Sequence, residues 1–138
     1  MEAPSIITGN CYSDARGKLL YNNSFNANGI KRIYLIENID TLFIRAWQGH
    51  RIEQRWFSAI VGNFEVKLIA VDNWDNPSKA LPPIVFELSS EKMDVLHIPG
   101  GYISSIQAKT DGAKLLVMAD YMLGEIKDEY RFEAGHFN

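Results

Sequence analysis

The sequence predicts an all-β protein built as a sandwich or barrel of short strands. Apolar runs between Ile30 and Gly62 alternate with polar residues at a period near two, which is typical of half-buried strands. Turn-forming residues separate such runs at close spacing along the chain, and we expect about nine or ten short strands. The chain has no alternation of strands and helices and no glycine-rich phosphate loop, which excludes a doubly wound α/β fold.

Composition favours one compact domain over residues 1–138, because 46% of the residues are hydrophobic and 12% are aromatic. The net charge of −3 comes without a basic block, so nucleic acid is not an expected partner. Cys11 is the only cysteine, so an intrachain disulfide is excluded and the cytoplasm is the expected compartment. No stretch approaches the ~18 to 20 apolar residues that span a bilayer, so we expect no membrane association.

The N-terminal part offers one candidate ligand contact. Residues 1–10 are expected to form an edge strand, an arm that reaches a second subunit, or a frayed terminus. Residues 14–21 are expected to form a turn that leads into a strand, and a polar loop follows. Arg16 beside the turn glycine is either an anion-binding residue or a solvated surface group.

The central stretch contains the candidate chemistry. The strand expected over residues 30–38 places Arg32 and Tyr34 on one face. The next strand places Gln48 and His50 on one face, and Arg45 and Trp47 on the other. The glycine at position 62 then predicts a hairpin between the runs 59–61 and 64–68.

Further strands are expected over residues 84–88, 95–99, 102–108 and 113–121, and residues 125–132 have helical character.

Closure of the sheet into a barrel would point every second residue into the interior. Gln48 and His50 would then face a cavity together with Arg32 and Tyr34. An imidazole, a phenol and a guanidinium at one place are a base, an acid and an anion clamp. Periodicity equally allows the opposite orientation, in which Lys31 and Trp47 point inward.

Other conspicuous side chains are expected to be structural. His97 lies on an apolar strand, and His136 lies in a polar tail and receives no role. Four aromatic residues either pack in the core or stack on a sugar or base: Trp47, Trp56, Phe57 and Trp74.

A metal centre is not expected. A catalytic zinc usually has three protein ligands, whereas this region offers only His50 and Glu53. Gln48 is a poor metal ligand, and the segment 99–104 contains no histidine.

The order of the motifs resembles a known family. The motifs are Arg16-Gly17-Lys18-Leu19, residues 30–36, Arg45, Gln48-Gly49-His50 with Gly62 twelve residues later, Leu96-His97-Ile98-Pro99, Asp120-Tyr121 and Asp128-Glu129-Tyr130-Arg131. Their order over residues 12–132 resembles that of the sugar 3,4-ketoisomerases that act on dTDP-4-keto-6-deoxyglucose, which are WxcM-like cupins. The resemblance implies a cupin-like double-stranded β-helix, or jelly-roll barrel, with one or two short helices at most. It also implies a dTDP-linked sugar as ligand, no metal or other cofactor, and a homodimer that exchanges N-terminal strands.

The chain departs from the family at one position. The family has His-Ala-His where this chain has Gln48-Gly49-His50. In the family the two histidines move the proton between C3 and C4 of the keto sugar, and glutamine cannot exchange protons near neutral pH. Three hypotheses follow: 3,4-ketoisomerisation with His50 alone, 3,5-epimerisation with a tyrosine as acid, and a cupin that binds a sugar nucleotide or stabilises a partner enzyme without catalysis.

We expect His50 to remove the acidic C–H beside the C4 ketone, with a pKa near the ordinary value of about 6.5. Gln48 and Tyr34 are expected to stabilise the enediolate by hydrogen bonds. Arg16 or Arg45 is expected to hold the diphosphate, and Arg32 is a further substrate-binding candidate.

Overall fold

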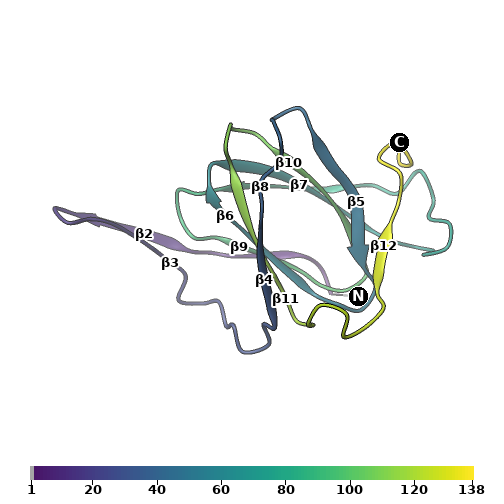
Figure 1. Cartoon of the computed structure of the whole chain (residues 1–138), viewed down its shortest axis with the longest axis horizontal. Helices are drawn as coiled ribbons and strands as arrows, with labels where there is room; N and C mark the ends of the chain where they lie inside the picture. Colours follow the sequence, from purple (N-terminus) through teal and green to yellow (C-terminus); the bar gives the residue numbers. More distant parts are fainter. Residues whose placement is uncertain (1) are drawn as a thin grey trace.

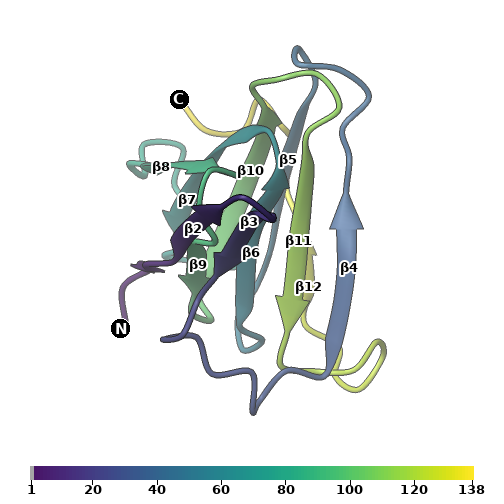
Figure 2. The same ribbon diagram turned by 90° about the vertical axis from the view of Figure 1, so that its left-hand side faces the viewer.

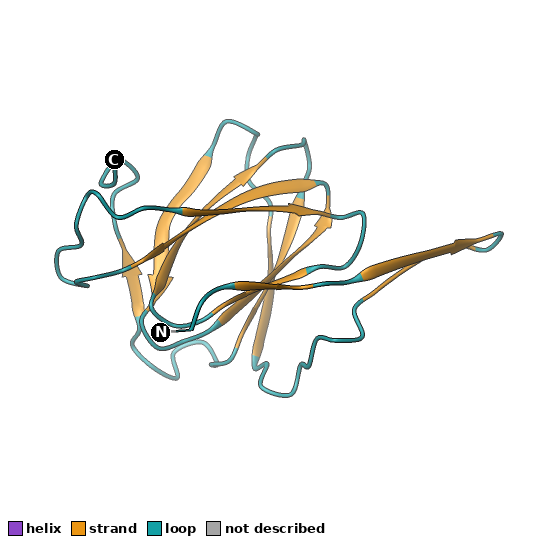
Figure 3. Cartoon of the chain, turned by 180° about the vertical axis from the view of Figure 1, so that it is seen from behind, coloured by secondary structure: helices purple, strands orange, loops and turns teal. Residues whose placement is uncertain are grey.

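A computed structural model describes residues 2–138, and Met1 of the expected N-terminal arm lies outside the described residues. Within this range the chain forms twelve strands and no helix. Figure 3 colours the strands orange and the loops teal. No helix that could cross a membrane is therefore present in residues 2–138. The prediction of an all-β chain is confirmed.

Ten of the strands form two antiparallel sheets that face each other (Figure 1). The first sheet has the order β1 (Ser5–Ile7), β9 (Val95–Ile98), β6 (Arg55–Val61), β11 (Lys114–Ala119) and β4 (Arg32–Ile36). The second sheet has the order β12 (Glu129–Arg131), β5 (Ile44–His50), β10 (Tyr102–Ala108), β7 (Asn63–Ala70) and β8 (Ile84–Ser89). This arrangement is a cupin-like jelly roll.

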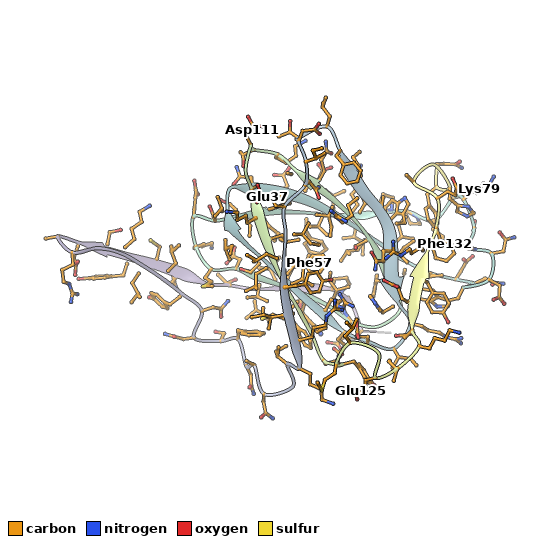
Figure 4. The ribbon with its side chains drawn as sticks, viewed as in Figure 1. Glu37, Phe57, Lys79, Asp111, Glu125 and Phe132 are labelled. Atoms are coloured by element: carbon orange, nitrogen blue, oxygen red, sulfur yellow. The ribbon has the colours of Figure 1, made fainter. Side chains whose placement is uncertain are left out.

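The main core lies between the two sheets, where alternate apolar residues of facing strands meet. Phe57 of β6 lies in this interior in Figure 4. The most deeply buried members of the core are Leu96, Leu115, Val117, Phe64, Val66 and Leu68. Burying each such side chain contributes roughly 1.5 to 3 kcal/mol, so the core fixes the relative position of the sheets.

A second apolar cluster covers the outer face of the second sheet. Trp47, Ile69 and Ile103 form its centre, and Phe132 and Phe137 of the C-terminal segment pack on them. The ring centroids of Trp47 and Phe137 lie 5.3 Å apart in an edge-to-face arrangement. Trp47 is therefore buried on the face that points away from the barrel interior.

Two local predictions are wrong. The turn at Gly62, with φ of 73°, does not close a hairpin, because β6 pairs with β9 and β11 whereas β7 pairs with β8 and β10. Gly62 instead passes the chain from one sheet to the other. Residues 125–132 form no helix, because residues 129–131 pair with β5 as the edge strand β12.

The remaining strands, β2 (Asn10–Asp14) and β3 (Gly17–Tyr21), form a hairpin that extends away from both sheets. Figure 1 shows this arm pointing away from the barrel, and Figure 2 shows β2 and β3 in front of the first sheet. Its apolar side chains Tyr12 and Leu19 are more than half exposed, at 56% and 60%. Ahead of the arm, β1 pairs with β9 of the same chain.

Candidate active site

A cavity opens between the sheets where β4, β5, β6 and β12 approach one another. It has an inner part of about 50 Å³ and an outer part of about 510 Å³. Five residues line both parts: Tyr34, Gln48, His50, Glu53 and Arg55. The cavity therefore brings together the three residues for which we predict a catalytic role, Tyr34, Gln48 and His50.

The alternation along β4 decides which of its faces points inward. Ile33 and Leu35 are 66% and 53% exposed, whereas Arg32 and Tyr34 are half-buried and line the outer cavity. The guanidinium carbon of Arg32 lies 4.6 Å from the ring centroid of Tyr34, which is a cation–π contact. Of the two orientations that periodicity allows, the structure therefore has the one in which Arg32 and Tyr34 point inward.

Arg45 also lines the inner pocket, although simple alternation places it on the opposite face from Gln48. A register shift explains the difference. Between the pairs Ser104 with Gln48 and Ile106 with Arg45, β5 contains one residue more than β10. This bulge turns Arg45 to the face of the sheet that lines the inner pocket, although the residue remains exposed, and its Nε donates a hydrogen bond of 3.3 Å to Oδ1 of Asn38.

Gly49 is required by close packing of β5 against β10. A Cβ atom at this position would overlap the carbonyl oxygen of Tyr102 and would lie 2.6 Å from Cα of Ile103. The absence of a side chain thus allows β5 to pack closely against β10 between the two cavity-facing residues Gln48 and His50.

His50 is 9% exposed, and Arg55 lies directly beside its imidazole. Nη2 of Arg55 lies 3.0 Å from Nε2 of His50. Because a guanidinium can only donate hydrogen bonds, Nε2 is the acceptor and the imidazole is neutral with its proton on Nδ1. Burial, and next the charge of Arg55, lower the pKa of His50 from 6.5 to about 4. The expected pKa near 6.5 is therefore wrong.

Arg55 is held in place by two further residues of the cavity. Its Nε donates a hydrogen bond of 2.6 Å to Oε2 of Glu53, and its Nη1 donates one of 2.6 Å to Oη of Tyr34. Since Tyr34 accepts this bond, its own hydroxyl proton remains available to a ligand. Arg55 is not among the residues predicted from the sequence to act in the site. One feature of the sequence could have indicated Arg55. It is a charged residue on the same strand face as Phe57 and Ala59, which are buried.

Asp128 fixes the loop that follows His50. Its carboxylate accepts hydrogen bonds from the backbone N–H groups of Arg51, Ile52 and Glu53, at 3.1, 2.8 and 2.8 Å. The side chain is 5% exposed, and it precedes β12 in the chain. The C-terminal segment therefore holds the loop that carries Glu53. Sequence spacing gives no sign of this contact, because it joins residues more than 70 positions apart.

Gln48 is bound to the C-terminal strand. Its Nε2 donates a hydrogen bond to Oε1 of Glu129, and Nη2 of Arg131 donates one of 3.2 Å to the same oxygen. Glu129 and Arg131 both belong to the motif at residues 128–131 that contributes to the family resemblance, but neither residue is predicted from the sequence to have a role in the site. Register explains the contact, since Arg131 is directly opposite Gln48 in the pairing of β12 with β5.

Arg16 does not join this group in its own chain. It lies at the tip of the projecting hairpin, where Nη2 makes an ion pair of 2.8 Å with Oδ2 of Asp14. Its side chain is 89% exposed. His97 lies outside the cavity as well, stacked on Trp56 with ring centroids 5.1 Å apart.

The donor set of the cavity does not resemble a metal site. Within residues 2–138, no group of three histidine, cysteine, aspartate or glutamate side chains is arranged to hold a metal ion. Nε2 of His50 and Oε2 of Glu53 lie 3.3 Å apart, and the guanidinium of Arg55 bonds to both. A protein cation thus occupies the position at which these two residues would bind a metal.

No protein-family model matches the chain, and no curated protein matches its sequence. Solved structures do match. A mutant of the 3,4-ketoisomerase QdtA from Thermoanaerobacterium thermosaccharolyticum, in complex with TDP-4-keto-6-deoxyglucose, is 22% identical with a TM-score of 0.72; the match covers 94% of this chain and 87% of QdtA. The TDP-quinovose 3,4-ketoisomerase WlaRB from Campylobacter jejuni is 22% identical with a TM-score of 0.66, over 96% of this chain and 95% of WlaRB.

An epimerase shares the architecture at lower identity. The rmlC epimerase of Mycobacterium tuberculosis is 11% identical with a TM-score of 0.70, over 95% of this chain and 69% of that protein. The resemblance to the sugar 3,4-ketoisomerases is therefore confirmed for the fold. The chain has the jelly-roll fold that these sugar-nucleotide ketoisomerases and epimerases share.

Proposed function

We propose that the protein is an isomerase that catalyses 3,4-ketoisomerisation of a dTDP-linked 4-keto-6-deoxyhexose. The observation that carries the proposal is the neutral imidazole of His50, buried beside the phenol of Tyr34 in the interior cavity. The fold supports it, since the 3,4-ketoisomerases QdtA and WlaRB have the same fold over most of this chain.

The chemistry follows from the protonation states. Neutral His50 removes the proton at C3, which is acidic because it lies beside the C4 ketone, and returns it to C4. Tyr34 donates a hydrogen bond to the oxygen at C4, and the amide of Gln48 donates through its second N–H. No metal or other cofactor is needed for these steps.

The diphosphate of the ligand is matched by cations of the outer cavity. Arg32 and Lys127 line this part, and neither forms an ion pair with a carboxylate among residues 2–138. Arg45 lies five positions from His50, or about 16 Å along β5, and we assign it to the inner end of the ligand. A guanidinium beside a phosphate forms a charge-assisted pair, which supports Arg32 as the main diphosphate ligand.

We propose further that the chain is a single cupin domain that forms a homodimer. The exposed apolar residues of the β2–β3 arm support this proposal, because contact with a second copy would cover Tyr12 and Leu19. Arg16 at the tip of the arm would then contact the second copy and its substrate. The exposed free thiol of Cys11 on the same arm supports a cytoplasmic location.

The proposal is tested by incubating the protein with dTDP-4-keto-6-deoxyglucose in deuterated water and following the label by NMR. A 3-keto product with deuterium at C4 supports 3,4-ketoisomerisation. Deuterium at C3 and C5 of a sugar that keeps its C4 ketone but has inverted configuration at these two carbons supports 3,5-epimerisation instead. Binding of the sugar nucleotide with no label at any carbon and no new product supports the non-catalytic binding protein.

A further inference from the structure

We propose that Glu129 is a second proton-transfer residue of this site, which carries the hydroxyl proton between O3 and O4 of the sugar while His50 carries the carbon-bound proton. This inference rests on the proposed ketoisomerase function. It addresses the gap that Gln48 leaves, because an amide side chain cannot take up or release a proton near neutral pH.

Strand register places Glu129 beside His50. The two residues are directly opposite each other in the antiparallel pairing of β12 with β5. Directly opposite residues project from the same face of a sheet with Cβ atoms about 4.5 to 5.5 Å apart. Both side chains accordingly line the outer cavity. Tyr130, the next residue, projects to the other face, where its ring centroid lies 4.6 Å from that of Trp74.

The carboxylate is held through one oxygen only. Gln48 and Arg131 both donate hydrogen bonds to Oε1, and these two contacts leave Oε2 for a ligand hydroxyl. The side chain is 54% exposed, so solvent and substrate reach it through the open cavity. Gln48 therefore positions Glu129 through one N–H of its amide, while its second N–H remains for the oxygen at C4.

The two other carboxylates of the outer cavity, Glu53 and Asp128, are buried, whereas the side chain of Glu129 is more than half exposed. Oε2 of Glu53 accepts a hydrogen bond from the buried guanidinium of Arg55. Asp128 accepts three backbone hydrogen bonds through both of its oxygens. Glu129 is thus the carboxylate that is placed to exchange a proton with a bound sugar.

The reaction balances without an added oxidant or reductant. His50 takes the C3 proton; the C–H electron pair forms the C3–C4 double bond, and the electron pair of the C4 carbonyl moves to O4. Glu129 takes the proton of the C3 hydroxyl and delivers it to O4. The O3 electron pair then forms the C3 carbonyl, and the electron pair of the double bond takes the proton from His50 at C4. Carbon C3 is oxidised and carbon C4 is reduced.

Glu129→Gln separates the two proton transfers. In deuterated water with dTDP-4-keto-6-deoxyglucose, NMR follows deuterium entry at C3 of the substrate and formation of the 3-keto product. We expect product formation to fall by about 10²-fold or more, while C3 exchange through His50 stays within a few-fold of the wild-type rate. Glu133→Gln removes the same charge from the exposed segment after β12, outside the cavity, and should leave both rates unchanged.

A second variant tests the carboxylate chemistry itself. Formate should restore product formation by Glu129→Ala, because a small carboxylate can occupy the space of the missing side chain. Three results would each overturn the role of Glu129 without overturning the proposed function. Glu129→Gln could form product at the wild-type rate, or it could lose exchange and product formation in parallel. A folded Glu129→Ala could also fail to recover product formation in formate. A wild-type protein that neither exchanges nor isomerises any dTDP-4-keto sugar overturns the proposed function, and this inference with it.

Discussion

Nη2 of Arg55 donates a hydrogen bond of 3.0 Å to Nε2 of His50, so a permanent cation holds the basic nitrogen of the cavity. Glu53 and Tyr34 hold the same guanidinium on its other N–H groups. The imidazole consequently stays neutral at all pH values well above 4. A neutral imidazole is the form that a general base requires.

The pH dependence of activity is the first consequence. The base works only when His50 is neutral, so activity falls as pH drops through the pKa of His50. We expect this acid limb near pH 4 rather than near 6.5. In Arg55→Gln the limb should move upward yet stay below 6.5, because burial, the larger cause of the shift, remains. Rate profiles of kcat/KM measure both values.

Arg51→Gln is the matched control for that experiment. Arg51 is exposed, follows His50 directly, and does not line the cavity. Its profile should coincide with that of the wild type. An acid limb near 6.5 in the wild type, or the same shift in both variants, would contradict the role of Arg55.

Gln48→His tests whether Glu129 carries out the proton transfer for which the resembling ketoisomerases have a histidine at the position of Gln48. If Glu129 supplies the second proton transfer, the change alone should alter kcat by only a few-fold. In the Glu129→Gln background it should raise kcat by about 10-fold or more, because it restores a second group that exchanges protons. Kinetics of the two single variants and the double variant measure this coupling, and simple additivity would argue against it.

Asp128→Asn tests how the loop after His50 is fixed. The amide has only one oxygen to accept from three backbone N–H groups, so buried donors lose their partner. We expect the free energy of unfolding to fall by about 1 to 3 kcal/mol and kcat to decrease. Urea unfolding measures the first effect. Asp111→Asn, in an exposed turn, is the control and should match the wild type in both properties.

Metal content is a further expected outcome. With Arg55 bonded to both His50 and Glu53, the cavity should bind no stoichiometric transition metal. Elemental analysis of protein purified without chelators should show no stoichiometric zinc, iron or manganese, and chelators should leave turnover unchanged. One equivalent of zinc, iron or manganese would refute this account of the donor set.

Period-two alternation predicted the part of the site that depends on single strands. It placed Gln48 and His50 on one face of their strand and Tyr34 with Arg32 on one face of theirs, without deciding which faces point inward, and the structure brings Tyr34, Gln48 and His50 to one cavity. Alternation fails at Arg45, because a bulge in β5 inverts its direction.

Contacts between distant strands could not be predicted in this way. Asp128 and Glu129 reach the site only because β12 pairs with β5, and a period of two does not say which strands are neighbours. The same limit explains the wrong hairpin at Gly62, since β6 and β7 belong to different sheets. The pKa of His50 depends on Arg55, whose side chain turns toward the imidazole only in the folded barrel.

Turnover of dTDP-4-keto-6-deoxyglucose by His50→Asn, with His136→Asn as the control histidine, tests the central claim most directly. His136 lies in the C-terminal segment and does not line the cavity, so its variant should retain wild-type kcat. His50→Asn should lose about 10²- to 10⁴-fold in kcat and keep its affinity for dTDP within a few-fold. Retention of wild-type turnover by His50→Asn would contradict the account.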